Sequence, residues 1–230
     1  MGAVSLILHK IACRHRHKLV LEDVSAAFGP GLTAIAGANG AGKTTLLRAI
    51  AGLHPLASGH IEGNENPARL GFLPQHTEID RRFPLSCRDF AALGAWSRVG
   101  TFSAIPAAES DRIAAAFARM GIADLASRPI ARLSSGQFQR LMFARLIVQD
   151  TPIMLLDEPF TAVDTATESV LIDQLLAWRD EGRVVVAVLH DHDMIRAFFP
   201  NTLLLGRGPA EFGPSSSVLA VEHRFTRSAA

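Results

Sequence analysis

One short stretch decides the fold of this chain: Gly37-Ala38-Asn39-Gly40-Ala41-Gly42-Lys43-Thr44-Thr45, with the G-x-x-x-x-G-K-[ST] spacing of a phosphate-binding loop. An apolar run, 31–36, precedes it, and residues 44–50 predict a helix after it. Glycines let backbone N–H groups turn around an anion, and the helix N-terminus points at the same anion. A glycine-rich turn that binds nothing is the alternative, but the complete motif favours a nucleoside triphosphate. The predicted nucleotide contacts in this loop are Gly37, Asn39, Gly40, Ala41, Gly42, Lys43, Thr44 and Thr45, with Lys43 on the β- and γ-phosphates and Thr44 on Mg²⁺.

The composition predicts a globular protein and names no charged partner. The chain has 230 residues, of which 48% are hydrophobic, enough for one compact unit with a subdomain. Its 23 basic and 22 acidic residues are interspersed and give a net charge of +1, so we expect no nucleic-acid surface. Cys13 and Cys87 stand far apart without a C-x-x-C pattern, which predicts reduced thiols in a cytoplasm and no disulfide.

Neither the N-terminal apolar stretch nor the longest apolar run elsewhere predicts a membrane span. The first apolar residues stop at His9-Lys10 with no small-residue cleavage site after them, so they predict a β-strand rather than a secretion signal. The run 184–189 is far too short to cross a bilayer. If the protein works at a membrane, another chain supplies the spans.

The order of elements along the chain predicts an α/β fold. Short β-rich segments surround the phosphate-binding loop, and 70–74 predicts a strand that proline ends. Alanine-rich segments between 83 and about 130 predict an inserted helical subdomain, with Ser110 as the N-cap and Gly121 as the stop of one helix. The apolar runs 152–156 and 184–189 predict buried parallel strands with a helix near 167–180 between them. The tail 206–230, rich in glycine, proline and serine, is weakly informative.

Two acids follow the first of those buried strands, at Asp157-Glu158-Pro159. Ligands of doubly wound sheets sit at the carboxyl ends of the strands. Asp157 suits a ligand to Mg²⁺, directly or through water, and Glu158 suits polarising or deprotonating an attacking water. An ordinary acidic turn is the alternative, which the phosphate-binding loop makes less favourable.

The segment Leu133-Ser134-Ser135-Gly136-Gln137-Phe138-Gln139-Arg140 resembles the LSGGQ signature of ATP-binding cassette (ABC) ATPases. The other elements occur in the family's order: the phosphate-binding loop, Gln75, the signature, the Asp157-Glu158 strand, the segment ending at Asp164, and His190. The resemblance implies a P-loop NTPase core with a RecA-like mixed sheet flanked by helices, an N-terminal antiparallel β subdomain and an inserted α-helical subdomain. The implied parts of this single ABC ATPase domain, 1–230, are the nucleotide-binding core with the β subdomain (1–82), the helical subdomain with the signature (83–145), and the resumed core with the tail (146–230).

The resemblance also implies that two copies of the chain sandwich two ATP molecules. Serine hydroxyls, a Gly N–H and a helix N-terminus near Gln137 would face one anion, with Ser134 and Ser135 capping the helix. In the family that anion is the γ-phosphate bound by the opposite subunit. Each site would join catalytic Glu158, His190 and Gln75, and metal-binding Thr44, Gln75 and Asp157, to the other copy's Ser134, Ser135, Gly136 and Gln137, with Asp164 also near nucleotide. Taken alone, the serines could be a plain N-cap, and His190 could be structural.

The histidines offer a second interpretation and one departure from the family. His190 and His192 invite a zinc site, but side chains two apart in an extended chain point to opposite faces. The chain has no Tyr, whereas the family usually stacks an aromatic residue on adenine; by spacing that position falls near His15. An imidazole can stack on a purine, although a solvated loop is an equal alternative. Ser135 replaces the first glycine of the signature, which puts closure geometry in doubt.

The stretch 75–90 is similar to the one that enters the helical subdomain in ABC importer ATPases for zinc and manganese, with Asp80, Arg81 and Phe83-Pro84 after the Gln. The implied protein is an ATP- and Mg²⁺-dependent motor, cytoplasmic and peripheral on the inner face of the cell membrane. Its implied partners are a second copy, an integral membrane permease and, indirectly, an extracytoplasmic metal-binding protein. The alternatives are the ATPase of an iron-chelate or haem importer, or a soluble ABC ATPase without transport. An unrelated P-loop kinase would leave the signature and His190 without a role.

Overall fold

The computed structural model describes residues 4–16, 18–75, 78–100, 104–206 and 208–220. They form two compact units, the first drawn from Met1–Leu70, Pro152–Glu158 and Trp178–Ala230, the second from Gly71–Thr151 and Pro159–Ala177. Predictions that touch the start of the first strand at 1–3, His17, the 76–77 part of the importer-like stretch, and the tail beyond 220 lie outside the described residues. The division at 82 and 145 stays a prediction.

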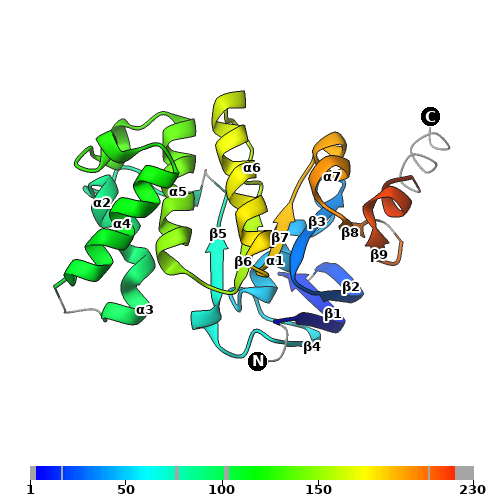
Figure 1. Cartoon of the computed structure of the whole chain (residues 1–230). Coiled ribbons are helices and arrows are strands. Elements are labelled where there is room, and N and C mark those ends of the chain that lie inside the picture. Colours follow the sequence, from blue (N-terminus) through cyan, green and yellow to red (C-terminus); the bar gives the residue numbers. More distant parts are fainter. Residues whose placement is uncertain (1–3, 17, 76–77, 101–103, 207, 221–230) are drawn as a thin grey trace. The chain divides into compact units, whose positions relative to one another are not determined.

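The first unit contains two sheets (Figure 1). Its elements are β1 (Leu6–His15), β2 (Lys18–Phe28), β3 (Gly31–Gly37), α1 (Lys43–Ile50), β4 (Ser58–Glu62), the 3₁₀ helix η1 (Pro67–Arg69), β6 (Ile153–Asp157), β7 (Val184–Val188), α7 (His192–Phe198), β8 (Asn201–Leu205) and β9 (Glu211–Pro214). The antiparallel sheet has the order β2-β1-β4, and the strands of the mixed sheet run in the order β6-β7-β3-β8-β9. The pairs β6/β7, β7/β3 and β3/β8 are parallel, whereas β8/β9 is antiparallel.

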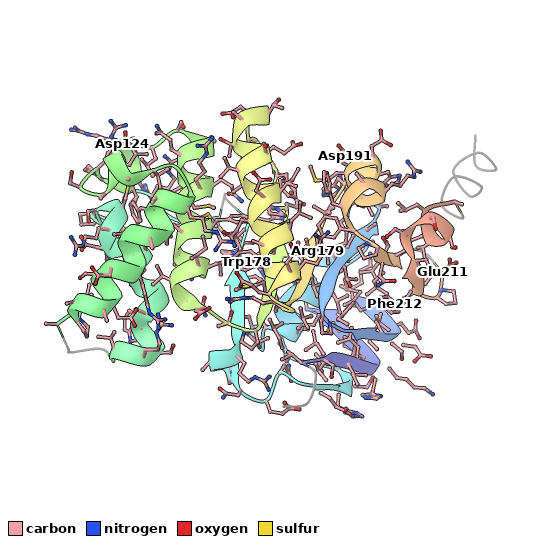
Figure 2. All side chains as sticks on the ribbon, in the orientation of Figure 1. Asp124, Trp178, Arg179, Asp191, Glu211 and Phe212 are labelled. Carbon is pink, nitrogen blue, oxygen red and sulfur yellow. The ribbon has the colours of Figure 1, made fainter. Side chains whose placement is uncertain are left out.

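Burial explains why the central strands form where they do. Every residue of β6 and β7 is buried, as is the stretch 32–36 of β3, which accounts for their continuous apolar sequences. Burial of one valine side chain there contributes roughly 1.5–3 kcal/mol. Phe212 of β9 meets Phe28 of β2 edge to face, with ring centroids 5.7 Å apart (Figure 2). The α/β fold with an antiparallel N-terminal sheet and a mixed sheet flanked by helices is therefore confirmed.

The second unit is mainly helical. Its elements are β5 (Leu70–Leu73, from Gly71 on), α2 (Cys87–Ala92), η3 (Leu93–Ala95), α3 (Trp96–Val99), α4 (Ala107–Arg119), η4 (Ala123–Leu125), η5 (Ile130–Arg132), α5 (Ser135–Gln149) and most of α6 (Thr165–Asp180). Helices α2 and α4 both pack against α5 (Figure 1). The core of this unit contains Phe138, Leu141 and Phe143 of α5, and the Phe138 ring lies 5.6 Å from that of Phe90 in α2.

Helix α4 begins earlier than the sequence predicted. Its first residue is Ala107, with Pro106 in the N-cap position, so the prediction of Ser110 as N-cap was wrong. Pro106 has φ −62°, which suits a helix start, and the two alanines after it are strong helix formers. Glu109 in the first turn is held by Arg98, which stabilises this early start. The predicted stop is confirmed: the helix ends at Arg119, and Gly121 has φ +63°.

Candidate functional site

The phosphate-binding loop, residues 37–45, is shaped by glycines in the left-handed backbone region. Gly40 has φ +80° and Gly42 has φ +96°, values that side chains disfavour. A Cβ on Gly42 would lie 2.6 Å from Cδ2 of Leu21, so neighbouring packing excludes one as well. Gly42 is the N-cap of α1, and no side chain in the described part of the chain caps this helix. The positive helix end therefore faces a loop made of backbone, an arrangement suited to an anion.

Lys43, the first residue of α1, lies folded into that loop. Its side chain is 6% exposed, and Nζ donates hydrogen bonds to the carbonyl oxygens of Gly37 at 2.8 Å and Ala38 at 3.1 Å. These bonds hold a positive charge beside the N-terminus of α1. Both features would attract phosphate oxygens, and the contact of Lys43 with the β- and γ-phosphates stays a prediction.

Thr44 and Asp157, 113 positions apart in the chain, meet beside the loop. Thr44 Oγ1 donates a hydrogen bond of 3.3 Å to Oδ1 of Asp157, the last residue of β6 and fully buried. The sequence placed this acid just after the strand, one position too late. A hydroxyl and a carboxylate are hard oxygen donors, the ligand class that Mg²⁺ takes in nucleotide sites. The donor set therefore fits Mg²⁺.

Glu158 and His190 form a second pair in the same unit. His190 Nε2 lies 2.9 Å from Oε1 of Glu158, although 32 positions separate them. Both side chains are partly exposed, 44% for His190 and 24% for Glu158. Glu158 has φ +50°, a left-handed conformation that is costly for a residue with a side chain. The pair thus combines a carboxylate and an imidazole in contact with solvent, which is suitable chemistry for holding or moving a proton of water.

His190 was expected to end the Val-rich strand, but β7 ends at Val188 and His190 lies in the loop before α7. Asp191 follows, and its Oδ1 accepts hydrogen bonds from the backbone N–H groups of Asp193 and Met194, which fixes the start of α7 (Figure 2). His192 is the first residue of that helix. The cap at Asp191 positions the loop that carries His190.

The signature segment, residues 133–140, starts α5 in the second unit. Ser134 is the N-cap: its Oγ accepts from Gln137 N at 3.2 Å, while Gln137 Oε1 accepts from Ser134 N at 3.1 Å. This is a capping box, and the S-x-x-Q spacing could have predicted it. Ser135 is the first helical residue and not a cap, so that prediction was wrong. The helix also starts two residues before Gln137, because Ser135 and Gly136 already follow the cap.

Asp164 lies next to the signature segment in this unit. A Cβ on Gly136 would come within 2.8 Å of Thr167 Oγ1 and 3.4 Å of Asp164 Oδ2. Asp164 Oδ1 accepts a 2.7 Å hydrogen bond from Thr167 N, and this bond lowers the pKa of Asp164. Arg140 Nε donates to Thr167 Oγ1 at 3.2 Å. Glycine at 136 therefore permits this close approach, and the Thr167 and Arg140 links were not predicted.

Two other buried groups missed by sequence reasoning support the second unit. Gln139 Nε2 donates to the carbonyl oxygen of Pro159 at 2.7 Å, which ties α5 to the residue after Glu158. Arg145 Nη2 donates to the carbonyl oxygen of Phe72 at 2.6 Å, and burial lowers the pKa of its guanidinium. Polar residues on an otherwise apolar helix are the only sequence signal for these bonds.

Gln75, His15 and the two cysteines are the remaining residues that the sequence singled out. Gln75 follows β5 in the second unit, and its carbonyl oxygen accepts from Glu78 N at 3.0 Å. His15 is the exposed last residue of β1, opposite Lys18. Cys13 and Cys87 are free and buried, and burial raises the pKa of each thiol. The roles of Gln75 and His15 stay predictions.

Comparisons with known proteins agree on one family. A family model described as ABC transporter matches residues 21–161. The chain is 36% identical over 222 residues to the manganese transport system ATP-binding protein MntB of Bacillus subtilis (strain 168), covering 94% of this chain and 89% of that protein. It is 35% identical over 209 residues to the zinc transport system ATP-binding protein TroB of Treponema pallidum (strain Nichols), covering 88% and 79%. A solved structure described as an inward-facing metal-chelate type ABC transporter is similar with a TM-score of 0.84 and 26% identity, over 94% of this chain and 85% of that one. Among the described residues, no helix is long and apolar enough to span a bilayer.

Proposed function

Because the chain belongs to the ABC transporter family and is one of its ATPases, we propose that it powers uptake of a divalent metal ion, zinc or manganese, through a separate membrane permease. The observation that carries the ATPase part is that one unit contains Lys43 folded into the phosphate-binding loop together with the pairs Thr44–Asp157 and Glu158–His190. The metal is supported by relatives named for manganese and zinc transport systems.

The nucleotide site uses the phosphate-binding loop as its cradle. Backbone N–H groups of 37–45 bind phosphate oxygens, and Lys43 turns its ammonium from the loop carbonyls toward the β- and γ-phosphates. Thr44 and Asp157 would hold Mg²⁺, which when bound would neutralise charge on the phosphate oxygens. His15 stacks on the adenine ring in place of the missing tyrosine. These residues bind and orient ATP; they do not by themselves activate water.

Activation of water is assigned to Glu158. Its carboxylate accepts a proton from the water that attacks the γ-phosphate, so that the O–P bond forms as the bond to ADP breaks. His190, in contact with Glu158 Oε1, orients that carboxylate and contacts the γ-phosphate. Gln75 would orient the same water and help to hold the metal ion.

A second copy of the chain completes each site. Ser134, Ser135, Gly136 and Gln137 at the start of α5 offer hydroxyl, amide and backbone N–H donors beside a helix N-terminus. These donors bind the γ-phosphate held by the partner copy, and Asp164 lies beside them. ATP closes the homodimer, and hydrolysis opens it.

The helical region after Gln75 conveys this motion to the permease. It exposes large apolar side chains, Phe83 at 64% and Trp96 at 51%, which suit a protein contact. The motor therefore works at the cytoplasmic face of the membrane, while an extracytoplasmic protein delivers the metal to the permease. Two other functions are tested beside this one: the motor of an iron-chelate importer, which the metal-chelate type structure favours, and a soluble ATPase without transport.

Metal uptake in cells that lack this gene tests the proposal, with zinc, manganese and iron each limiting. The strains carry the wild type, Glu158→Gln, or the control Glu211→Gln, an exposed carboxylate on β9. We expect zinc- or manganese-specific rescue by the wild type and the control but not by Glu158→Gln. Rescue for an iron chelate alone would select the chelate importer, and equal uptake in every strain would select the soluble class.

Purified chains separate the two catalytic assignments. Glu158→Gln should keep ATP binding, lose nearly all hydrolysis and accumulate a dimer. Undiminished turnover would show that Glu158 does not activate the attacking water. Ser134→Arg should block hydrolysis while the isolated chain still binds ATP, because Ser134 serves the partner's site. Loss of binding and hydrolysis together in a folded Ser134→Arg protein would argue against the arrangement in trans.

A further inference from the structure

Three potential metal ligands share one face of the antiparallel sheet, in a place that the proposed ATPase mechanism does not use. His9 of β1 lies directly opposite His60 of β4, and Glu62 is two residues beyond His60. Because side chains alternate between faces along a strand, His60 and Glu62 lie on the same face. The pairing of β1 with β4 adds His9 to them.

The donor atoms of the three side chains converge. Nε2 of His9 lies 2.9 Å from Oε1 of Glu62, and Nε2 of His60 lies 3.6 Å from the same oxygen. The two imidazole rings are stacked, with centroids 4.3 Å apart and an interplanar angle of 14°. All three potential ligand atoms lie within 4.8 Å of one another. Two parallel rings thus present the same nitrogen to one carboxylate.

Local backbone irregularities bring these side chains together. The register of β1 and β4 shifts between His9 and Ala12, and Lys10 has φ +46°. Such a bulge re-aims the side chains beside it. On the opposite strand Gly59 has φ +82°, and a Cβ there would lie 2.5 Å from the carbonyl oxygens of His9 and Lys10. Glycine therefore allows β4 to approach β1 closely, immediately before His60.

His9 Nε2 is enclosed but makes no hydrogen bond among the described residues. The 2.9 Å approach of Glu62 lacks hydrogen-bond alignment, although it is within ion-pair distance. A buried polar atom without a hydrogen bond is costly, and a bound cation would satisfy it. This atom is the strongest sign that the cluster serves a ligand.

We propose that His9, His60 and Glu62 bind one Zn²⁺ ion. Two imidazole nitrogens and one carboxylate form a donor set that zinc takes with a water as the fourth ligand. Ligand distances of about 2.0–2.1 Å in a tetrahedron place donor atoms about 3.3 Å apart. The spacings of 2.9 and 3.6 Å lie on either side of that value. The two rings must also rotate out of their stacked arrangement, because each imidazole binds a metal in its own plane, and the exposure of these side chains permits this rotation.

The donor set also sets the selectivity. Imidazole suits zinc, whereas manganese and magnesium prefer carboxylate, carbonyl and water oxygens and bind nitrogen sites more weakly. The site therefore takes zinc in preference to manganese. Bound zinc would link β1 to β4 and stabilise the antiparallel sheet. This property is independent of the metal that the transporter carries.

Zinc titration of the full chain without nucleotide tests the site, by calorimetry and by the visible absorption of Co²⁺ as a substitute. The variants are His60→Ala and Glu62→Gln, both exposed and so compatible with folding, and the control is His54→Ala, a histidine outside the cluster. Circular dichroism checks that each variant folds. Neither readout needs ATP hydrolysis, so failure here leaves the proposed function intact.

We expect one zinc per chain, a four-coordinate Co²⁺ spectrum, and a rise in melting temperature with zinc. His60→Ala and Glu62→Gln should each weaken zinc binding more than about 100-fold, beyond the 10–100-fold cost of losing an outer partner of a metal ligand. His54→Ala should bind as the wild type does. Equal zinc affinity in all four proteins, or equal affinity for manganese and zinc in the wild type, would overturn the proposal.

Discussion

Replacement of Arg98 by methionine should loosen the helical unit, because this side chain joins three of its helices. From α3, Arg98 donates to both oxygens of Glu109 in α4, with Nε–Oε1 at 3.1 Å and Nη2–Oε2 at 2.9 Å. It also donates to the carbonyl oxygens of Val148 and Gln149, at the end of α5. There its positive charge meets the negative end of the helix dipole.

The size of the effect follows from burial. Removing one partner of a fully buried ion pair costs about 3–5 kcal/mol. The Glu109 side chain is 11% exposed but that of Arg98 is 31% exposed, so solvent screens the pair. We therefore expect Arg98→Met to lower the free energy of unfolding by about 2 kcal/mol, of which the contacts to the end of α5 contribute roughly 0.3–1. At about 2–4 °C per kcal/mol, the melting temperature should fall by about 4–8 °C.

Urea unfolding at pH 7 measures this loss, and a second arginine provides the matched control. Arg112 approaches Glu109 only to 3.9 Å and is 52% exposed, so Arg112→Met should cost less than about 0.5 kcal/mol. In a double-mutant cycle, Glu109→Gln should recover part of the loss caused by Arg98→Met, since no buried charge then stays unpaired. An Arg98→Met protein as stable as Arg112→Met would refute the reasoning.

The same pair predicts a pH dependence. Arg98 lowers the pKa of Glu109 from its ordinary 4.5, first through hydrogen bonds and then through its charge. A carboxyl whose pKa is lower in the folded chain stabilises fully above its unfolded pKa and loses this contribution as the pH falls through the folded value. The stability difference between wild type and Arg98→Met should therefore be constant from pH 6 to 8 and shrink below about pH 4.5. A difference that grows toward acid would contradict the assignment.

Three further substitutions test packing and capping. Gly37→Ala should cost more than about 4 kcal/mol or prevent folding, because its Cβ would lie 2.0 Å from the Leu205 carbonyl oxygen at φ +137°; wild-type urea stability would contradict this. Ser134→Ala should lose the cap of α5 and about 1 kcal/mol of stability, and Ser134→Thr should restore most of it. Equal melting temperatures for Ser134→Ala and the wild type would show that the cap does not stabilise α5. Gln139→Leu should cost roughly 1–3 kcal/mol in urea unfolding, since the buried Pro159 carbonyl loses its donor; a neutral effect would show that water replaces the amide.

The sequence predicted the buried strands well, because their signal is local. Runs of valine, isoleucine and leucine as long as β6 and β7 fit strands covered on both faces, and the glycine spacing of 37–45 restricts the backbone directly. Boundaries were less predictable where tertiary contacts decide them. The start of α4 depends on the bond from Arg98 to Glu109, which no local pattern indicates.

The candidate site was predictable as a set of residues but not as a geometry. The motifs predicted Thr44, Asp157, Glu158 and His190 as site residues. The pairing of Thr44 with Asp157 and of Glu158 with His190 depends on strand order, which joins segments far apart in the chain. The His9 cluster was missed for the same reason, since the register of β1 against β4 is invisible in a single strand. The assembly of two copies stays a prediction.

The left-handed backbone at Glu158 lowers the stability of the fold at the residue that we propose as the base. A residue with a side chain at φ +50° costs about 1 kcal/mol more than glycine would, so the native residue is not the most stable choice at this position. A library of all amino acids at 158, ranked only by resistance to heat, should place glycine above glutamate and so select proteins without the carboxylate that we propose as the base. Thermal screening of this chain should therefore be paired with an activity screen wherever position 158 is varied.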